Sequence, residues 1–403
     1  MKKSTAILLF VIGCLLLFAT EILRVYFIMP FPGSQQHDTV GLAWWIDHYR
    51  LALRFLGLIL IAAPLARFWR NGKIFGKIML SILILFYGTI FYFFNYRFEA
   101  DKMFYQPSTV KFADSAGNKI AANKLVIGVV VNNEAKAYPI QLIGYHHQVR
   151  DTFGSTPVMI TYCTVCRTGR VFSPFVGGRP EKFRLVGMDH FNAMFEDAST
   201  GSWWQQATGA AIAGPLKAEQ LAELPSAQLT LAGWLKMHPD SKILQPDTIY
   251  KKRYNDLADY DDGKIKGGLE HRDSLSWKPK SWVVGVRSGT YAKAYDWNEL
   301  VSRSLIQDTV GTTPVLVFVG DDSATYHVWN RQVAGQTLSF DKVAGQQLLA
   351  DNTGSQWDLS GRCISGKLKD EQLQPVQAYQ EFWHSWSHFH PATTRFMAAP
   401  RGE

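Results

Sequence analysis

The stretch VIGVVVNNEAKAYPIQLI at residues 126–143 decides the fold, because the chain contains a second version of it, VVGVRSGTYAKAYDWNEL, at residues 283–300. Three further pairs of segments follow in the same order: DTFGSTPVMITY (151–162) with DTVGTTPVLVFV (308–319), TGSWWQQATGAAIAGPLKAEQL (200–221) with TGSQWDLSGRCISGKLKDEQL (353–373), and WLKMHP (234–239) with WSHFHP (386–391). Four matches in one order indicate an internal duplication.

Each half contains short runs of β-branched or alternating apolar residues, bounded by Gly, Pro, Asn and Ser, which is typical of strands. The segments PIQLIGYHHQV and LAGWLKMHP instead indicate short helices. We therefore predict an α+β, β-rich duplicated domain with two related halves, at residues 99–250 and 281–403. The polar stretch 251–280, which is rich in Gly, Lys and Asp, is the predicted linker.

Three apolar runs precede this domain and predict a three-helix transmembrane segment at residues 1–98. We expect the membrane-spanning helices at about 5–28, 45–68 and 74–97. No convincing small-x-small cleavage site follows the first run, so we expect a retained anchor rather than a removed signal peptide.

Five ionisable residues lie in or beside these apolar runs. Glu21 and Arg24 are one helical turn apart and could pair. Asp47, Arg50 and Arg54 fall on one helical face. We interpret these three as interfacial charges beside two tryptophans, with an internal ion pair as the alternative.

Basic residues predict the orientation of the anchor. Lys2 and Lys3 precede the first run, and four basic residues crowd the short link between the second and third runs, whereas residues 29–46 contain no Lys or Arg. By the positive-inside rule, the N-terminus is cytoplasmic and the domain after about residue 98 is extracytoplasmic, at the cytoplasmic (inner) membrane. Disulfides can persist in that compartment.

The composition narrows the function classes. Hydrophobic residues make up 47% of the 403 residues and charged residues 19%, which argues against disorder. The net charge of +8 does not indicate nucleic-acid binding, because the basic excess is spread thinly and starts at the membrane. The sequence assigns no residue to catalysis, and we leave open whether the protein is an enzyme and in which oligomeric state it works.

The motif YCTVCRTG at residues 162–169 occurs in the first half only. Cys163 and Cys166 align with Val319 and Asp322 of the second half. Features shared by both halves are expected to be scaffold, so this difference marks the cysteine pair as the candidate functional feature. The flanking β-branched residues favour a strand, a turn and a returning strand over the helix start that a thioredoxin-type couple needs.

A strand–turn–strand shape suits a metal knuckle, in which both thiolates point to one ion. His146 or His147 upstream, and Met188, His190 or Met194 downstream, are the candidate further ligands. Thiolate, imidazole and thioether ligands are soft and favour copper over zinc. A tight disulfide or two buried thiols are the structural alternatives.

Charged and imidazole side chains elsewhere have a smaller predicted role. Arg167 and Arg170 follow the cysteines and are expected to lower the pKa values of the thiols. His384 and His388 lie four residues apart, and we interpret them as half-exposed helix residues rather than as metal ligands.

The stretch from AYPIQLIGYHH to TGRVF, followed by AMFEDASTGSWWQQ, resembles the prokaryotic family called domain of unknown function 3179. The likeness covers roughly residues 100–395, with TYCxxC and DTxGxTPV as its distinctive parts. The family pattern has an aromatic–His pair before the Asp-Thr turn and a Met-aromatic-acid stretch before TGSxW, which implies His146 and Met194 as the further ligands. The chain departs from the pattern at Arg167, where the family often has a glycine that would ease the turn. The resemblance implies no activity.

These observations predict a membrane-anchored, extracytoplasmic protein that binds a metal, with copper favoured over zinc, or transfers electrons, through Cys163, Cys166, His146 and Met194. Besides the lipid bilayer, a metal or electron donor or acceptor protein is the expected partner. One alternative is a thiol–disulfide oxidoreductase that uses the two cysteines as a redox couple. The other is a non-catalytic module that binds a ligand in an aromatic groove between the halves.

Overall fold

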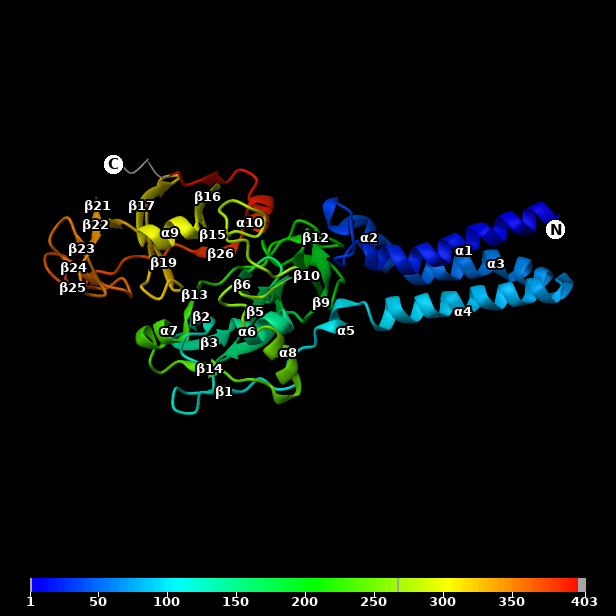
Figure 1. Ribbon diagram of the computed structural model, residues 1–403, viewed down its shortest axis with the longest axis horizontal. Helices are drawn as coiled ribbons and strands as arrows, with labels where there is room; N and C mark the ends of the chain where they lie inside the picture. Colours follow the sequence, from blue (N-terminus) through cyan, green and yellow to red (C-terminus); the bar gives the residue numbers. More distant parts are fainter. Residues whose placement is uncertain (1, 267, 398–403) are drawn as a thin grey trace. The chain divides into compact units, whose positions relative to one another are not determined.

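The computed structural model describes residues 2–266 and 268–397 (Figure 1). Residues 1, 267 and 398–403, which the predicted anchor, linker and second half include, lie outside the described residues. The chain forms two compact units: the first comprises residues 1–106 and 174–221, and the second comprises residues 107–173 and 222–403. These units do not follow the repeat, since the first unit combines the N-terminal helices with a segment of the first half.

Three long helices lie where apolar runs predicted them: α1 (Lys3–Tyr26), α3 (Arg50–Asn71) and α4 (Ile74–Tyr96). Each is long and apolar enough to cross a membrane. They run side by side (Figure 1, blue and cyan), and a glycine permits the close approach of α1 and α3. A Cβ atom on Gly57 would lie 2.7 Å from Leu17 Cγ. The second long helix begins at Arg50 rather than near residue 45, because a separate helix, α2 (Val40–His48), precedes it.

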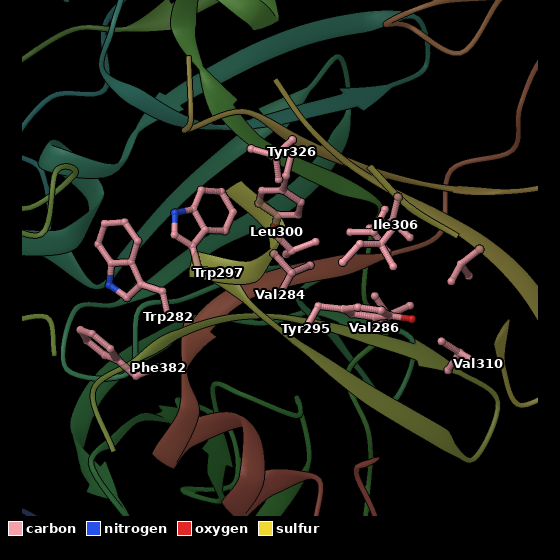
Figure 2. Close-up of a cluster of buried hydrophobic side chains, with 14 residues drawn as sticks. Trp282, Val284, Val286, Tyr295, Trp297, Leu300, Ile306, Val310, Tyr326 and Phe382 are labelled. Atoms are coloured by element: carbon pink, nitrogen blue, oxygen red, sulfur yellow. The ribbon is translucent and has the colours of Figure 1, made fainter. Parts of the chain in front are cut away.

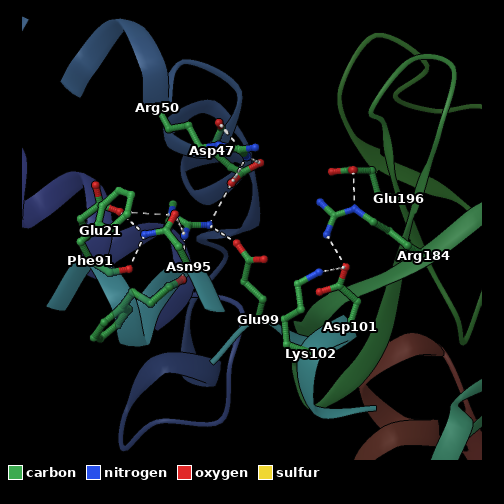
Figure 3. Close-up of polar contacts among 12 residues, drawn as sticks. Glu21, Asp47, Arg50, Phe91, Asn95, Glu99, Asp101, Lys102, Arg184 and Glu196 are labelled. Atoms are coloured by element: carbon green, nitrogen blue, oxygen red, sulfur yellow. Dashed lines mark hydrogen bonds and ion pairs between the residues drawn. The ribbon is translucent and has the colours of Figure 1, made fainter. Parts of the chain in front are cut away.

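Glu21 is the centre of a polar network at one end of this helix bundle (Figure 3). Its buried carboxylate accepts hydrogen bonds of 2.7 Å from both Nε and Nη2 of Arg54. Asn95 Nδ2 and Tyr87 Oη donate to the same carboxylate over 2.8 Å and 3.2 Å. Arg54 thus pairs with Glu21 of a neighbouring helix, and Arg50 pairs with Asp47 over 2.7 Å, while the interfacial position of Asp47, Arg50 and Arg54 stays a prediction.

Arg24 joins three segments of the same unit. Its guanidinium donates to Asp47 Oδ1 over 3.2 Å, to Glu99 Oε1 over 3.0 Å and to the carbonyl of Phe94 over 2.7 Å. The expected pair with Glu21 is longer, at 4.0 Å. Arg24 thereby connects α1 with α2 and with the end of α4.

An antiparallel sheet completes the first unit, in the order β12-β11-β10-β9. Its strands are β9 (Phe183–Asp189), β10 (Asn192–Asp197), β11 (Trp203–Gln205) and β12 (Ala211–Ala213). The segment between α1 and α3 lies on this sheet, since Met188 N donates to the carbonyl of Ile28 over 2.7 Å and Trp44 Nε1 to that of Gly201 over 2.8 Å.

The second unit contains the same mixed sheet twice, once in each half. In the first half the order is β1-β14-β3-β2-β13, with β1 (Phe112–Ala113) as an additional edge strand, and in the second half it is β27-β16-β15-β26. The first-half strands are β2 (Leu125–Val131), β3 (Glu134–Pro139), β13 (Ser226–Thr230) and β14 (Lys242–Leu244). The second-half strands are β15 (Trp282–Ser288), β16 (Tyr291–Asp296), β26 (Ala378–Phe382) and β27 (Thr394–Arg395). The pairings of β14 with β3 and of β27 with β16 are parallel, and the other pairings of both sheets are antiparallel.

A three-stranded antiparallel sheet also occurs in each half. Its strands are β4 (Gln148–Phe153), β5 (Thr156–Cys163) and β6 (Thr168–Phe172), and then β17 (Leu305–Val310), β18 (Thr313–Val319) and β19 (Tyr326–Asn330). The matching helices are α6 (Ile140–His146) with α9 (Trp297–Arg303), and α7 (Leu231–Met237) with α10 (Trp383–Phe389). The predicted fold class, with two related halves and short helices, is thereby confirmed.

The motifs that the halves share form equivalent contacts. The tyrosine of each AKAY segment donates to the aspartate of each DTxG turn: Tyr138 to Asp151 over 2.6 Å and Tyr295 to Asp308 over 2.9 Å. These pairs join the two sheets of each half, as expected of scaffold residues.

A glycine faces a tryptophan at the same place in each half. Gly128 in β2 lies against the indole of Trp234, and Gly285 in β15 lies against that of Trp386. Any Cβ atom at either glycine would overlap the ring. The glycines thus allow α7 and α10 to pack directly on their strands.

The core of the second half lies between its sheets and α9 (Figure 2). It combines aromatic and β-branched side chains: Trp282, Val284, Val286, Tyr295, Trp297, Leu300, Ile306, Val310, Val315, Val317, Val319, Tyr326, Val328 and Phe382. These residues alternate along β15 and β18, which is why a period of two marked the strands in the sequence. Four further strands, β22 (Phe340–Lys342), β23 (Leu348–Asp351), β24 (Gln356–Asp358) and β25 (Cys363–Ser365), form the next sheet.

We expect Gly128→Ala and Gly285→Ala each to lower the free energy of unfolding by about 3 kcal/mol, because the added methyl group overlaps a buried indole. Chemical unfolding of the full chain in detergent measures both. Gly117→Ala is the control, since its Cβ atom would make only ordinary contacts. Equal stability of all three variants would contradict the proposed packing.

We expect Glu21→Ala to lower the stability of the helix bundle by about 2 kcal/mol, because Arg54 then loses its carboxylate partner in apolar surroundings. The double variant with Arg54→Leu should recover part of that loss. Thermal unfolding of the full chain in detergent tests this, with the exposed Glu219→Ala as control. Strictly additive effects of the two substitutions would show that the pair is not coupled.

Candidate functional site: the cysteine pair

The CxxC motif forms the tip of the hairpin made by β5 and β6. β5 ends at Cys163, residues 164–167 form the turn and β6 begins at Thr168. This arrangement confirms the predicted strand, turn and returning strand. Both cysteine side chains are thiols without solvent exposure, and the two thiols are hydrogen-bonded to each other. The tip therefore holds two sulfur atoms next to one another in a buried setting.

Arg167 occupies the left-handed position of this turn, with a φ of 55°. A residue with a Cβ atom adopts that conformation at a cost of about 1–2 kcal/mol, which glycine avoids. Its guanidinium compensates through contacts: Nε donates to Gln380 Oε1 over 2.9 Å, and Cζ lies 3.7 Å from the ring centroid of Trp282. The carbonyls of Tyr260 and Asp261 accept two further hydrogen bonds.

The second half covers the tip. Phe382 N donates to the carbonyl of Cys166 over 3.0 Å, so the end of β26 binds the turn directly. Lys280 Nζ donates to the carbonyl of Val165 over 2.7 Å, and His384 Nε2 lies 3.2 Å from the same oxygen. Three segments that are far apart in the sequence thus meet at the turn.

The surroundings of Cys166 favour the protonated thiol. Burial raises the pKa of Cys166, and the neighbouring Cys163 thiol raises it further. The hydrogen bond with Ser385 and the charge of the Lys280 ammonium act in the opposite direction. Removing a proton from this site is therefore costly unless a cation replaces it.

The two arginines bind the second half rather than the thiols. Arg170 Nη2 donates to Glu381 Oε1 over 2.5 Å, both side chains are buried, and Cζ lies 3.3 Å from the ring centroid of Tyr379. Arg167 is held as described above. The expectation that these arginines lower the thiol pKa is thus not met at Cys166, and Lys280 is the cation that lowers it.

His146 is buried at the end of α6 among three tyrosines. Its Nε2 lies 2.7 Å from Tyr254 Oη, which occupies one of the two nitrogens that could bind a metal. The neighbouring His147 donates from Nδ1 to the carbonyl of Gly144 over 2.8 Å, and burial lowers its pKa to about 4. Both rings therefore have structural partners on α6 and α8 (Lys251–Asp256).

Met194 lies in β10 of the first unit, within an apolar cluster. Its buried neighbours are Ile28, Val40, Ala43, Val186, Trp203 and Ala213. Among residues 2–266 and 268–397, no three His, Cys, Asp or Glu side chains are grouped so that they could hold a metal ion. Of the four predicted ligands, the structure brings Cys163 and Cys166 together.

The covering residues Lys280, His384 and Ser385 are part of the site, and the sequence reasoning missed this role. In the structure, each half covers the hairpin tip of the other half. Asp322, which aligns with Cys166, accepts a hydrogen bond of 3.1 Å from Thr230 Oγ1 of the first half.

Comparisons with known proteins complete this description. The sequence profile of a family described as "Protein of unknown function (DUF3179)" matches residues 105–393. No curated protein and no solved structure matches the chain.

Burial lowers the pKa of His384 to about 4, against an ordinary value of 6.5. Between these pH values His384 binds a proton in the unfolded chain but not in the folded protein. The free energy of unfolding should therefore fall as the pH decreases from about 6.5 to about 4. We expect His384→Asn to reduce that pH slope by up to about one proton. Chemical unfolding across this pH range tests the expectation, with the exposed His271→Asn as control. An unchanged slope in His384→Asn would contradict it.

Proposed function

Because the chain belongs to the DUF3179 family, whose description assigns no activity, we propose a function from its own residues. The protein is a membrane-anchored, extracytoplasmic copper-binding protein that holds one Cu(I) ion between Cys163 and Cys166. The observation that carries the proposal is the pair of adjacent, buried thiols at the tip of a hairpin. The second half of the duplicated domain has no cysteine at the corresponding positions.

The ligand set selects Cu(I) among the common metals. Cu(I) is soft and accepts two thiolates as its ligands, whereas zinc is almost always bound by four nitrogen, oxygen or sulfur ligands. His146 and Met194 have other partners in the structure, so the proposed site has two protein ligands rather than the four expected from the sequence.

The surroundings suit the charge of such a complex. Two thiolates and one Cu(I) ion carry a net charge of −1, and a buried charge needs a partner. Lys280 supplies a positive charge that interacts with both cysteines, and Ser385 supplies a hydrogen bond to Cys166. Lys280 and the start of α10 also shield the ion from water.

The orientation and the partner belong to the same proposal. The basic residues near the N-terminus and between α3 and α4 favour a cytoplasmic N-terminus and an extracytoplasmic domain at the inner membrane. A copper donor or acceptor protein in that compartment is the proposed partner.

A thiol–disulfide couple is the second candidate, because the two thiols are close enough to hydrogen-bond. Two features count against it. Burial keeps both sulfurs away from the disulfide of a substrate protein, and the raised pKa of Cys166 reduces the thiolate that such exchange requires.

We expect the reduced full chain in detergent to bind one Cu(I) ion in competition with a colorimetric Cu(I) chelator. Cys163→Ser and Cys166→Ser should each abolish that binding. Cys363→Ser is the matched control, since Cys363 is equally buried but has no cysteine partner. Copper binding that survives the double cysteine variant, or no binding by the wild-type chain, would end the proposal.

Copper binding should also release protons, because burial and the Cys163 thiol keep Cys166 protonated near neutral pH. If both thiols lose a proton, the apparent affinity rises by about 100-fold for each pH unit. Titration at several pH values, corrected for the chelator, measures this slope. A reversible disulfide without copper binding would instead support the thiol–disulfide couple.

A further inference from the structure

A cavity of about 520 Å³ lies inside the second unit, at the junction of the two halves and the linker. Arg167 contributes to its wall from the first half, Arg272 from the linker, and Trp282 and Trp297 from the second half. Figure 2 shows the two indole rings side by side at one end of the apolar core. The function proposed above does not use this cavity.

Two positive charges meet at one ring of this wall. Arg167 Cζ lies 3.7 Å and Arg272 Cζ 4.0 Å from a ring centroid of Trp282. Burial lowers the pKa of Arg272, and the charge of Arg167 lowers it further. Within the described part of the chain, neither guanidinium has a carboxylate within ion-pair distance.

Two of the three aspartates in the same wall, Asp262 and Asp322, have other partners. Asp262 pairs with Lys264 over 3.2 Å. Asp322 accepts hydrogen bonds from Thr325 and Thr230. The third, Asp261, has one buried carboxylate oxygen without a hydrogen-bond partner among the described residues, and its charge offsets part of that of Arg167.

Two donors of the wall also lack an acceptor. Arg272 Nε and Trp282 Nε1 are buried and have no hydrogen-bond partner among the residues that the structure describes. A buried donor without a partner is unfavourable, and native proteins contain few of them. Both belong to the same pair of stacked side chains, so one oxyanion could serve both.

We propose that this cavity binds a small organic anion whose carboxylate or phosphate group accepts hydrogen bonds from Arg272 and Trp282. The unpaired donors select a ligand group that accepts hydrogen bonds, and an oxyanion accepts several at once. The rest of the ligand lies against Trp297, which offers an aromatic face. The volume suits a molecule of metabolite size.

Isothermal titration calorimetry of the full chain in detergent tests this, with citrate and inorganic phosphate as the probes. We expect one equivalent of at least one probe to bind, and Arg272→Gln to weaken the binding by about tenfold or more. Binding of citrate alone identifies a carboxylate site, and binding of phosphate alone identifies a phosphate site. Trp282→Phe, which keeps an aromatic ring but removes the donor, should weaken the same probe.

Arg395→Gln is the matched control, because the Arg395 guanidinium lies over Trp277 and Trp383 outside the cavity wall. This variant should bind the probe as the wild-type chain does. Cys163→Ser should bind it as well, which separates this proposal from copper binding. Equal binding by Arg272→Gln and the wild-type chain, or binding of neither probe at millimolar concentrations, would overturn the proposal.

Discussion

Each half of the duplicated domain covers the hairpin tip of the other half, and the cysteine site depends on this mutual covering. In one direction, Phe382 and Lys280 bind the backbone of the CxxC turn. In the other, Thr230 binds Asp322 at the tip of the second hairpin. Because the buried polar groups of each tip are paired by the other half, neither hairpin is complete alone. The thiols owe their burial and their nearby positive charge to residues more than 100 positions further along the chain.

The parts of the fold that follow from local pattern were predictable. The alternation of apolar residues marked the strands, the apolar runs marked the three long helices, and the repeated motifs marked the two halves. Motifs in both copies proved to be scaffold, as the Tyr138–Asp151 and Tyr295–Asp308 pairs show. The hairpin around the cysteines was also readable, because its β-branched residues leave little choice of local structure.

The contacts between distant segments were not predictable in the same way. The sequence offers His146 as a ligand, but its partner Tyr254 lies 108 residues away, and no spacing rule connects them. Met194 looks like a soft ligand, yet it fills an apolar cluster. The pattern of a single helix also does not reveal that Arg54 pairs with Glu21 on a neighbouring helix. In each case packing between segments decided the role of the residue.

The mutual covering of the two hairpin tips also affects how fast the buried site can open. The two sulfur atoms are buried by both halves, so they become accessible only while the CxxC turn and the start of α10 are apart. The rate of this local opening therefore limits how fast a ligand can reach or leave the sulfur atoms. A mutation far from the cysteines that weakens the contact between the turn and α10 would change the rate of ligand exchange, although the sulfur atoms themselves stay the same. The lifetime of a bound ligand then depends on the stability of the contact between the two repeat halves.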